Sequence, residues 1–426
     1  MSTAWTSRYA QRAKNIKSSA IRELLKITQK PEIISFAGGL PAPDVFPTDR
    51  FREACNKVLE KQAAQALQYG ATEGYEPLRE MIARHTARYG VKAKPENVLL
   101  TSGSQQALDL IGKLFINAGD RVLVEAPTYL GALQAFNVYG AEYVSVPSDN
   151  EGLRTDQLES SLRLGPKFMY VLPNFQNPGG TTLAECRRHE LVLLADRYGI
   201  PIIEDDPYGQ LRYEGEHLPP LIVLDRANLR RDDGYSIGNV IYLSTFSKTL
   251  APGLRLGWIV APAEVIAKLV QLKQGADLHT STFVQMVAYE VARDNFLDEH
   301  IKLIRKVYGE RRNVMLEALG EYFPPEVTWT HPQGGLFLWV TLPEGMDCQQ
   351  LFEAAIKENV AFVAGDSFYA ANGFAEQGRR HFRLNFSNAQ PEQIREGIRR
   401  LAVAIRNQWR KLHPGYDRPV DQHVFD

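Results

Sequence analysis

Residues 240–260 read VIYLSTFSKTLAPGLRLGWIV, two short apolar runs separated by a polar turn. The runs Val240–Leu243 and Gly257–Val260 have the length and composition of buried strands. The turn places Lys248 among small hydroxyl residues, and Arg255 follows seven positions later. A lysine in such a turn is either a solvated loop residue or an amine whose surroundings help it lose its proton, and this segment alone does not decide which.

The same alternation of apolar runs and helical patterns begins at about residue 95. Five further strands are expected, at Val98–Leu100, Arg121–Val124, Tyr143–Val146, Phe168–Leu172 and Ile200–Ile203. Helical patterns lie between several of them, at Gln105–Asn117, Gly131–Tyr139 and Ala184–Tyr198. Strands that alternate with helices predict an α/β fold with a mainly parallel seven-stranded sheet flanked by helices.

A second pattern follows this sheet. Ala276–Asn295 is expected to be a long helix that leads out of the first region. After it we expect three helices and two strands, at Ile301–Leu319, Leu336–Thr341, Cys348–Glu358, His381–Phe386 and Pro391–Gln408. We therefore predict an N-terminal segment (residues 1–45) that packs with the small domain, a large ligand-binding domain (46–295) and a smaller α+β domain (296–426).

Composition excludes several classes of protein. The formal net charge is −1, which gives no attraction to nucleic acid or to an anionic membrane. No run approaches the ~18 apolar residues that a membrane helix needs. The three cysteines form no CxxC pair, and the first thirty residues lack an apolar core of the secretory type. We therefore expect a cytoplasmic protein that binds neither nucleic acid nor membranes.

The loops after the predicted strands carry polar and aromatic groups, and ligands of parallel sheets bind at these carboxyl ends. Gly103 permits a tight turn, and Ser104 can cap a helix that starts at Gln105, whose free N–H groups suit a phosphate. Tyr129 could stack on a planar ligand or simply pack in its loop. Asn177 lies in the turn PNFQNPGG and could donate a hydrogen bond to a ligand.

Two further segments carry candidate ligand-binding side chains: the loop EDDPY and a strand of the small domain. Asp205 and Tyr208 lie in EDDPY, directly after an apolar run, and buried carboxylates are costly unless one meets a cation. A metal is the alternative cation, but no HExxH is present and the nine histidines are scattered. Arg383 alternates with Phe382 and Leu384 along a strand of the small domain, where it could grip a carboxylate or form a structural salt bridge.

Together these loops favour pyridoxal 5′-phosphate (PLP) as the ligand. PLP needs a lysine for its aldehyde, donors for its phosphate, and a carboxylate for its ring nitrogen. Lys248 supplies the first, Thr245, Ser247 and Arg255 the second, and Asp205 the third. Each group lies at a strand end, and their agreement favours the reactive interpretation of Lys248.

At this point the chain resembles a known family, the fold-type I PLP-dependent aminotransferases of class I, nearest the α-aminoadipate and kynurenine aminotransferases. The resemblance runs from about Ile16 to Trp409. It rests on eight blocks in the family's order: SGSQQALDL, EAPTYLGA, NFQNPGG, EDDPYG, STFSKTLAPGLRLG, KQGADLHT, GGLFLW and FRLNFS. Two features differ or stand outside it: the loop reads NPGG where many relatives have NPTG, and residues 225–238 form a long charged stretch without a functional explanation.

The resemblance implies a role for each site residue. Lys248 would bind the cofactor and move the proton, Asp205 would meet the ring nitrogen, and Tyr129 would stack on the ring. Asn177 and Tyr208 would meet the ring oxygen. The phosphate would be held by Ser104, Gln105, Thr245, Ser247 and Arg255.

The resemblance also implies how substrate binds. Arg383, with Asn177, would bind the α-carboxylate, and Tyr69 would reach the phosphate of the partner subunit in a homodimer with shared sites. The segments 18–25 and 36–41 resemble the mobile lid of the aminoadipate branch. In this lid Arg22 would meet a distal carboxylate or swing aside for apolar side chains, and Gly39 would border the substrate.

The expected reaction is a ping-pong exchange of an amino group between an L-amino acid and a 2-oxo acid. Glutamate with 2-oxoglutarate is the expected exchange pair, and the other substrate could be 2-aminoadipate, an aromatic or a branched-chain amino acid. A PLP-dependent lyase or decarboxylase of the same fold is the alternative. A sensor domain of a transcription regulator is a further alternative, but only about forty residues precede the fold, too few for a winged helix.

Overall fold

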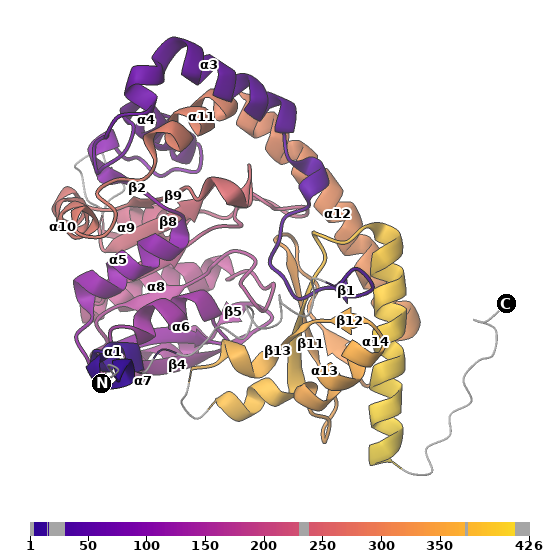
Figure 1. Ribbon diagram of the computed structural model, residues 1–426. Coiled ribbons are helices and arrows are strands. Elements are labelled where there is room, and N and C mark those ends of the chain that lie inside the picture. Colours follow the sequence, from indigo (N-terminus) through magenta and orange to yellow (C-terminus); the bar gives the residue numbers. More distant parts are fainter. Residues whose placement is uncertain (1–3, 15, 17–29, 230–237, 371–373, 414–426) are drawn as a thin grey trace.

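The computed structural model describes residues 4–14, 16, 30–229, 238–370 and 374–413. These residues form a large part built on one wide sheet and a smaller part built on a second sheet (Figure 1). The predicted lid segment 18–25, which includes Arg22, and most of the 225–238 stretch lie outside the described residues. The division into three domains stays a prediction.

The large sheet contains all seven predicted strands and one more. Its spatial order is β2 (Val98–Thr101), β9 (Gly257–Val260), β8 (Val240–Thr245), β7 (Ile202–Asp205), β6 (Met169–Val171), β3 (Arg121–Ala126), β4 (Glu142–Asp149) and β5 (Gly152–Leu153). The strands from β8 to β4 are parallel, whereas β9 is antiparallel to both of its neighbours. The unpredicted β5 is two residues long and antiparallel to β4. The predicted α/β fold class with a mainly parallel sheet is confirmed.

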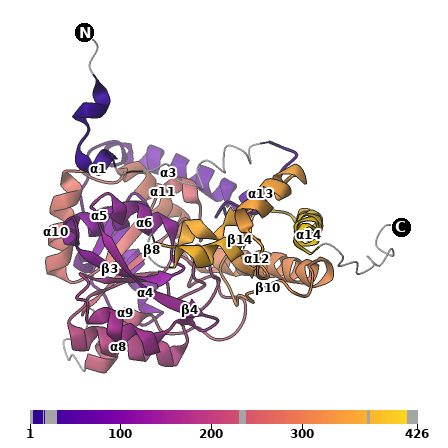
Figure 2. The ribbon, with the colours of Figure 1, turned by 90° about the horizontal axis from the view of Figure 1, so that it is seen from below.

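Alternate residues of each strand pack into different hydrophobic clusters on the two faces of this sheet. Leu99 and Leu243 pack with α5 (Ser104–Phe115), α6 (Leu130–Asn137) and α10 (Ala263–Gln274). Val98 and Tyr242 pack on the opposite face, with α4 (Glu76–Ala87), α8 (Glu185–Tyr198) and α9 (Leu221–Leu229). Figure 2 shows the sheet between α5 and α6 on one side and α8 and α9 on the other. Burial on both faces explains the continuous apolar runs of the sequence.

The small sheet has the order β10 (Thr328–Trp329), β11 (Phe337–Thr341), β14 (His381–Asn385) and β13 (Val363–Ala364). The helices α12 (Phe296–Tyr322), α13 (Cys348–Lys357) and α14 (Pro391–Leu412) belong to this part, and α12 leads to it from the large part (Figure 1). Phe382 and Leu384 are buried in its core, as the predicted alternation of β14 requires. A separate pair, β1 (Ile34–Ser35) and β12 (Val360–Ala361), joins the N-terminal segment to this part.

One predicted helix is wrong. The sequence pattern predicts one helix over Ala276–Asn295, but the observed helix in this range, α11, covers only Thr282–Ala292. The preceding helix, α10, ends at Gln274. The segment between them is not helical because Leu278 adopts a φ of +62° and Ser281 caps α11 by accepting a hydrogen bond from the Val284 N–H. This interruption frees several polar side chains for contacts outside a helix.

The remaining elements are short or were not anticipated. α3 (Thr48–Ala66) runs beside α11 along the outer edge of the large part (Figure 1). The single-turn elements are η1 (Trp5–Arg8), α1 (Gln11–Lys14), η2 (Pro43–Val45), η3 (Pro95–Asn97), η4 (Thr155–Gln157), α7 (Leu158–Leu162), η5 (Pro252–Leu254), η6 (Gly365–Phe368) and η7 (Ala375–Arg380). Within the described part of the chain, no helix is long and apolar enough to cross a membrane.

Candidate active site

A cavity of about 280 Å³ opens at the carboxyl ends of β6, β7 and β8. It lies where the α/β rule places ligands. Of the predicted site residues that the structure describes, all except Tyr69 line it. They are Gly39, Ser104, Gln105, Tyr129, Asn177, Asp205, Tyr208, Thr245, Ser247, Lys248, Arg255 and Arg383.

Lys248 lies in the turn between β8 and β9, and its Nζ donates a hydrogen bond to the Gly39 carbonyl at 2.8 Å. Burial, followed by the positive charges of Arg383 and Arg255, lowers the pKa of Lys248 to about 8. An amine with such a pKa is partly neutral near pH 7 and can attack a carbonyl. The environment therefore favours the reactive interpretation of this lysine over a solvated loop.

Asp205 ends β7 with its carboxylate buried beside the cavity. The Tyr170 hydroxyl donates to Oδ2 at 2.7 Å, whereas Oδ1 is buried without a partner among the described residues. Burial raises the pKa of Asp205 to about 7, although the Tyr170 hydrogen bond acts in the opposite direction. A buried carboxylate with one unpartnered oxygen fits a protonated ring nitrogen, which would supply the missing donor and charge.

The two neighbouring carboxylates do not compete for this role. Glu204 accepts hydrogen bonds from two backbone N–H groups at the start of α9, at 2.8 and 3.0 Å. Asp206 accepts from the Asn174 amide at 2.9 Å and from the Tyr242 hydroxyl at 3.0 Å. Both are therefore occupied structurally, and Asp205 is the acid left for a ligand.

The anion-binding turn is formed by Gly103, Ser104 and Arg255. Gly103 adopts a φ of +80°, and a Cβ there would lie 2.6 Å from Arg255 Nη2, so only glycine allows this approach. The prediction that Ser104 caps the helix is wrong. Ser104 is the first residue of α5, Gly103 is the N-cap, and the Ser104 hydroxyl is buried without a partner in the described structure. Helix N–H groups, a hydroxyl and a guanidinium thus meet at one point, which suits a phosphate.

Thr245 and Ser247 hold the other side of the turn that carries Lys248. The Thr245 hydroxyl accepts the Ser247 N–H at 3.1 Å and donates to the Leu256 carbonyl at 2.7 Å. The two hydroxyl oxygens lie 2.9 Å apart. Thr245 therefore links the two ends of the turn, and its hydrogen bond to the Ser247 N–H fixes the position of Ser247 in the cavity lining.

The position of Tyr129 depends on a glycine. Tyr129 precedes α6, and a Cβ at Gly131 would lie 2.5 Å from the Tyr129 ring. The amide of Gln105 donates to the Gly131 carbonyl at 3.0 Å, so Gln105 ties α5 to α6 as well as lining the cavity. This arrangement holds an aromatic ring in the cavity wall.

Arg383 enters the cavity from β14 of the small part. Its Nη1 donates to Asn177 Oδ1 at 2.6 Å and its Nη2 to the Ala37 carbonyl at 2.7 Å, while Nε is buried without a partner among the described residues. The guanidinium also lies 4.1 Å from the centre of the Phe337 ring. Burial lowers the pKa of Arg383 to about 10, although Tyr208 acts in the opposite direction. A buried guanidinium with neutral acceptors is suited to a carboxylate ligand.

Arg383 does not form a structural salt bridge with any described residue, because no carboxylate in the described part of the chain lies within 4.0 Å of it.

Tyr208 lies in the cavity wall, as predicted. Its ring is buried and packs edge-on against Phe337, with the ring centres 5.8 Å apart. Asn177 and Tyr208 therefore share the cavity, as the predicted contacts to one ring oxygen require.

Two predicted residues are not among the described residues that line the cavity. Tyr69 is 79% exposed, and its ring contacts His279 edge-on at 5.9 Å between centres. Arg22 lies outside the described residues. Sequence reasoning missed Tyr170, whose hydroxyl fixes Asp205. A tyrosine in a buried strand is ordinary, and only the register of the parallel strands, which pairs Tyr170 with Ile203, could have indicated this contact.

Comparison with known proteins gives the family. Residues 34–401 match the family model described as aminotransferase class I and II. The chain is 47% identical over 410 residues to aromatic-amino-acid aminotransferase 1 of Thermococcus litoralis, with 95% of each chain covered. It is 45% identical over 405 residues to 2-aminoadipate transaminase of Thermus thermophilus, with 95% of this chain and 98% of the relative covered.

Solved structures agree. The α-aminoadipate aminotransferase of Thermus thermophilus, complexed with N-(5′-phosphopyridoxyl)-L-leucine, superimposes with a TM-score of 0.87 at 43% identity, over 96% of this chain and 99% of that one. The kynurenine aminotransferase of Pyrococcus horikoshii gives a TM-score of 0.88 at 44% identity, over 95% and 98%.

The fold and the cavity thus define a fold-type I aminotransferase. The chain belongs to the class I and II aminotransferase family. The predicted branch, enzyme class and cofactor, PLP, are confirmed at this level. The lyase or decarboxylase alternative is not supported by these relatives.

Proposed function

We propose that this cavity binds PLP and an L-amino acid together, and that the chain exchanges the amino group of that amino acid with a 2-oxo acid in a ping-pong reaction. The observation that carries the proposal is the meeting of Lys248, Asp205 and Arg383 in one cavity. An amine with a lowered pKa, a buried acid with an unpartnered oxygen, and a buried guanidinium are the three groups that an amino-acid complex of PLP requires.

When bound, PLP supplies a carbonyl carbon for the amino group and a positively charged ring that withdraws electrons. The residues present fit it. Asp205 Oδ1 can accept from the ring nitrogen, and the turn at Gly103, together with Arg255, offers donors to the phosphate. Tyr129 would flank the ring, and Asn177 and Tyr208 would border the ring oxygen.

Lys248 and Arg383 act on the substrate. We propose that the neutral amine of Lys248 takes the proton from the substrate α-carbon. The Arg383 guanidinium and the Asn177 amide would bind the α-carboxylate, which fixes the orientation of the Cα–H bond. The same guanidinium donates to Asn177 Oδ1 and to the Ala37 carbonyl, which hold it in the cavity wall.

For the substrate we propose glutamate and 2-oxoglutarate as the exchange pair, with 2-aminoadipate, aromatic or branched-chain amino acids as partners. The relatives' names support an acidic and an aromatic substrate. Arg22 is proposed to meet a distal carboxylate, and Gly39, which accepts the Lys248 hydrogen bond, to border the substrate.

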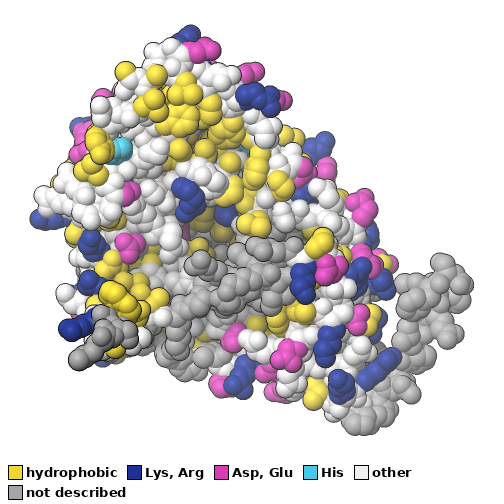
Figure 3. All heavy atoms as spheres, viewed as in Figure 1, with side chains coloured by type: hydrophobic (Ala, Val, Ile, Leu, Met, Phe, Trp, Pro, Cys, Tyr) yellow, Lys and Arg dark blue, Asp and Glu magenta, His cyan; other side chains and the backbone are white. Residues whose placement is uncertain are grey.

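We further propose a cytoplasmic homodimer with shared sites. Leu67 and Tyr69, two large side chains of one segment, are exposed by 73% and 79%. Figure 3 shows hydrophobic side chains gathered over α3 and α11. A second copy covering this face would bring its Tyr69 toward the anion-binding turn of the first.

A half-reaction screen tests the function. Purified PLP-loaded protein is mixed with single amino acids without a 2-oxo acid, and the change in cofactor absorbance is followed together with the release of the matching 2-oxo acid. Glutamate and 2-aminoadipate are expected to react, and Arg383→Lys is expected to lower kcat/KM by roughly 100-fold because a lysine cannot form two parallel hydrogen bonds with a carboxylate. Release of ammonia or carbon dioxide in place of a 2-oxo acid would contradict the proposal.

A further inference from the structure

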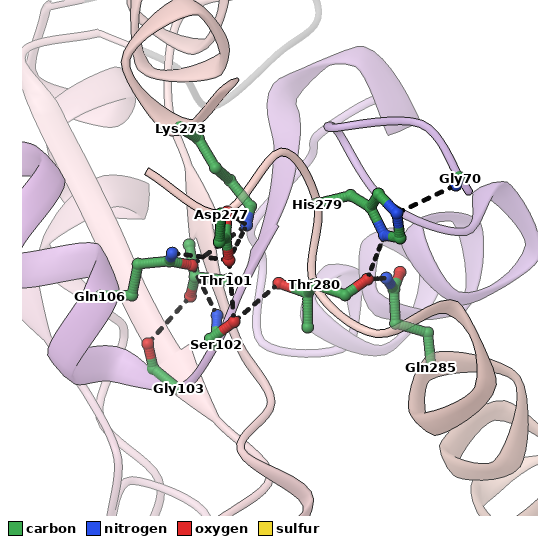
Figure 4. Close-up of polar contacts among 10 residues, drawn as sticks. All are labelled: Gly70, Thr101, Ser102, Gly103, Gln106, Lys273, Asp277, His279, Thr280 and Gln285. Atoms are coloured by element: carbon green, nitrogen blue, oxygen red, sulfur yellow. Dashed lines mark hydrogen bonds and ion pairs between the residues drawn. The ribbon is translucent and has the colours of Figure 1, made fainter. Parts of the chain in front are cut away.

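A polar cluster adjoins the anion-binding turn from outside the cavity (Figure 4). We call it the Asp277 cluster; its members are Ser102, Gln106, Lys273, Asp277 and Thr280. Lys273 is fully buried, and its Nζ donates to both carboxylate oxygens of Asp277, at 2.6 and 2.8 Å. These residues do not contact the ligand space, because none of the five is among the described residues that line the cavity.

Asp277 gathers donors from three parts of the chain. Besides Lys273 at the end of α10, it accepts the Ser102 hydroxyl at 3.1 Å and the Gln106 amide at 2.7 Å, both at Oδ2. Gln106 in turn accepts the Ser102 N–H at 2.8 Å and a hydrogen bond from Lys273 at 3.1 Å. The turn before α5 is therefore fixed through both the backbone and the side chain of Ser102.

This turn is the one that presents the phosphate donors. Ser102 directly precedes Gly103, the N-cap of α5, and Ser104, the first residue of its N-terminal turn. Gly103 has a φ of +80°, one of several conformations open to glycine, so its neighbours select this one, and Arg255 packs against it. Ser102, which donates a hydrogen bond to Asp277, is thus two residues before Ser104, a proposed phosphate ligand.

The cluster continues on its other side to the segment of Tyr69. Thr280 Oγ1 lies 3.2 Å from the Ser102 hydroxyl, and its carbonyl accepts the Gln285 amide at 2.7 Å. His279 Nε2 accepts the Gly70 N–H at 3.2 Å, so its Nδ1 carries the hydrogen that is donated to the Thr280 carbonyl at 2.9 Å. Figure 4 shows these bonds as one connected path from Gln106 to Gly70.

The path therefore joins two segments that are distant in sequence. One carries the proposed phosphate donors of this subunit. The other carries Tyr69, which is proposed to reach the phosphate of the partner.

We propose that Asp277 is a positioning residue: with Lys273 it holds the anion-binding turn in shape and ties that turn to the segment that carries Tyr69. The inference rests on the proposed PLP site, because it assigns the cluster to the phosphate end of the cofactor.

Electrostatics explains why a charged pair is used. Burial alone would raise the pKa of Asp277, but hydrogen bonds from Lys273, Gln106 and Ser102 lower it overall, so the carboxylate stays charged. A carboxylate accepts several strong hydrogen bonds at once, whereas a neutral group of the same size accepts fewer. Lys273 balances the negative charge, which would otherwise repel a phosphate bound at the adjacent turn.

The test compares two ligands of the cofactor-free protein. PLP and pyridoxal have the same ring and aldehyde, and only PLP has the phosphate. The variant is Lys273→Met/Asp277→Ala, which removes the pair together and leaves no unpaired buried charge. We expect the dissociation constant for PLP to rise about tenfold, equivalent to about 1.4 kcal/mol, with that for pyridoxal nearly unchanged.

A matched control is the pair of Arg187 in α8 and Asp149 at the end of β4, an ion pair of the same part of the molecule. Arg187→Met/Asp149→Ala is expected to lower the free energy of unfolding without changing the ratio of the two dissociation constants. If the double variant of the cluster does not fold, Ser102→Ala removes one of its hydrogen bonds and is expected to change the same ratio about threefold, half of the logarithmic effect.

The outcomes separate the two proposals. If the parent protein does not prefer PLP to pyridoxal, the proposed phosphate site is wrong. If the parent prefers PLP and both cluster variants keep its ratio, the role of Asp277 is wrong. Amide hydrogen exchange of residues 68–76 is expected to quicken in the double variant, and unchanged exchange there would refute the link to Tyr69.

Discussion

At Lys248 the side chain's surroundings set its reactivity. The amine is buried and lies near two guanidinium groups, so its pKa falls from 10.5 to about 8. Only the neutral amine attacks an aldehyde, and below the pKa its fraction falls about tenfold per pH unit. We therefore expect uptake of PLP by the cofactor-free protein to accelerate with rising pH and to level off above about pH 8, as measured by stopped-flow absorbance.

Two results would contradict this expectation. A rate that continues to rise toward pH 10.5 would mean that the cavity does not shift the pKa. Uptake that persists unchanged in Lys248→Ala would remove this lysine from its role. Arg255→Gln and Arg383→Gln serve as comparison variants, since loss of either positive charge is expected to move the midpoint to higher pH.

Asp205 combines a cost in stability with a proposed catalytic role. Burial raises its pKa from 3.8 to about 7. Between pH 3.8 and about pH 7, the cofactor-free folded protein therefore binds a proton that the unfolded chain has released. Its free energy of unfolding falls as the pH rises through this range. Asp205→Asn lacks this cost. We expect the cofactor-free variant to melt at a higher temperature than the parent at about pH 8, and the difference to disappear below about pH 4.

The same substitution should impair turnover of the PLP-loaded enzyme by roughly 100- to 1000-fold, because the charge that stabilises the protonated ring is lost. Tyr170→Phe keeps the carboxylate and removes one hydrogen bond, so a loss of about tenfold is expected. Equal losses in steady-state kcat for the two variants would show that the charge of Asp205 is not what matters.

At the scale of one element, α6 positions Tyr129 through a missing side chain. A Cβ at Gly131 would lie 2.5 Å from the Tyr129 ring, so Gly131→Ala should displace the ring and raise the dissociation constant for PLP. Gly320 is also helical, but a Cβ there meets nothing within 4 Å. Gly320→Ala should leave PLP binding unchanged and stabilise the protein by about 0.5–1 kcal/mol, because alanine is the better helix former.

Fluorescence titration with PLP and thermal unfolding check both variants. An affinity that is equal in Gly131→Ala and in the parent would mean that Tyr129 does not need its present position.

The elements of the large sheet could be predicted because their strands are buried on both faces and leave continuous apolar runs. The same holds for β14, where Phe382 and Leu384 alternate with Arg383. The break between α10 and α11 could not be predicted, because Leu278 has a left-handed backbone and its neighbours have a helical pattern. Residue types at strand ends identified the cavity residues, and contacts such as Tyr170 with Asp205 needed the strand register.

For the whole molecule, the placement of Tyr69 leads to a test with mixed dimers. Tyr69 is exposed and lies outside its own cavity, so a shared site requires it to act across the interface. Lys248→Ala and Tyr69→Ala subunits are each expected to form weakly active or inactive homodimers. A mixed dimer would contain one intact site, and its activity should exceed that of both parents in assays of co-expressed, separately tagged subunits.

Homodimers of each variant mixed without exchange of subunits are the control. If purified mixed dimers show no gain in activity, Tyr69 serves its own subunit or neither.

The pairing of β1 with β12 also affects how the enzyme is made. Ile34 and Val360 are partners in this pair, and the residues just after β1 include Gly39, which holds the Lys248 amine. A ribosome releases the N-terminal strand long before its partner, so the nascent chain carries an unfinished cavity wall through most of its synthesis. Catalytic competence therefore arises only after Val360 and Ala361 have emerged, and a translation product that stops before them lacks the strand that pairs with β1.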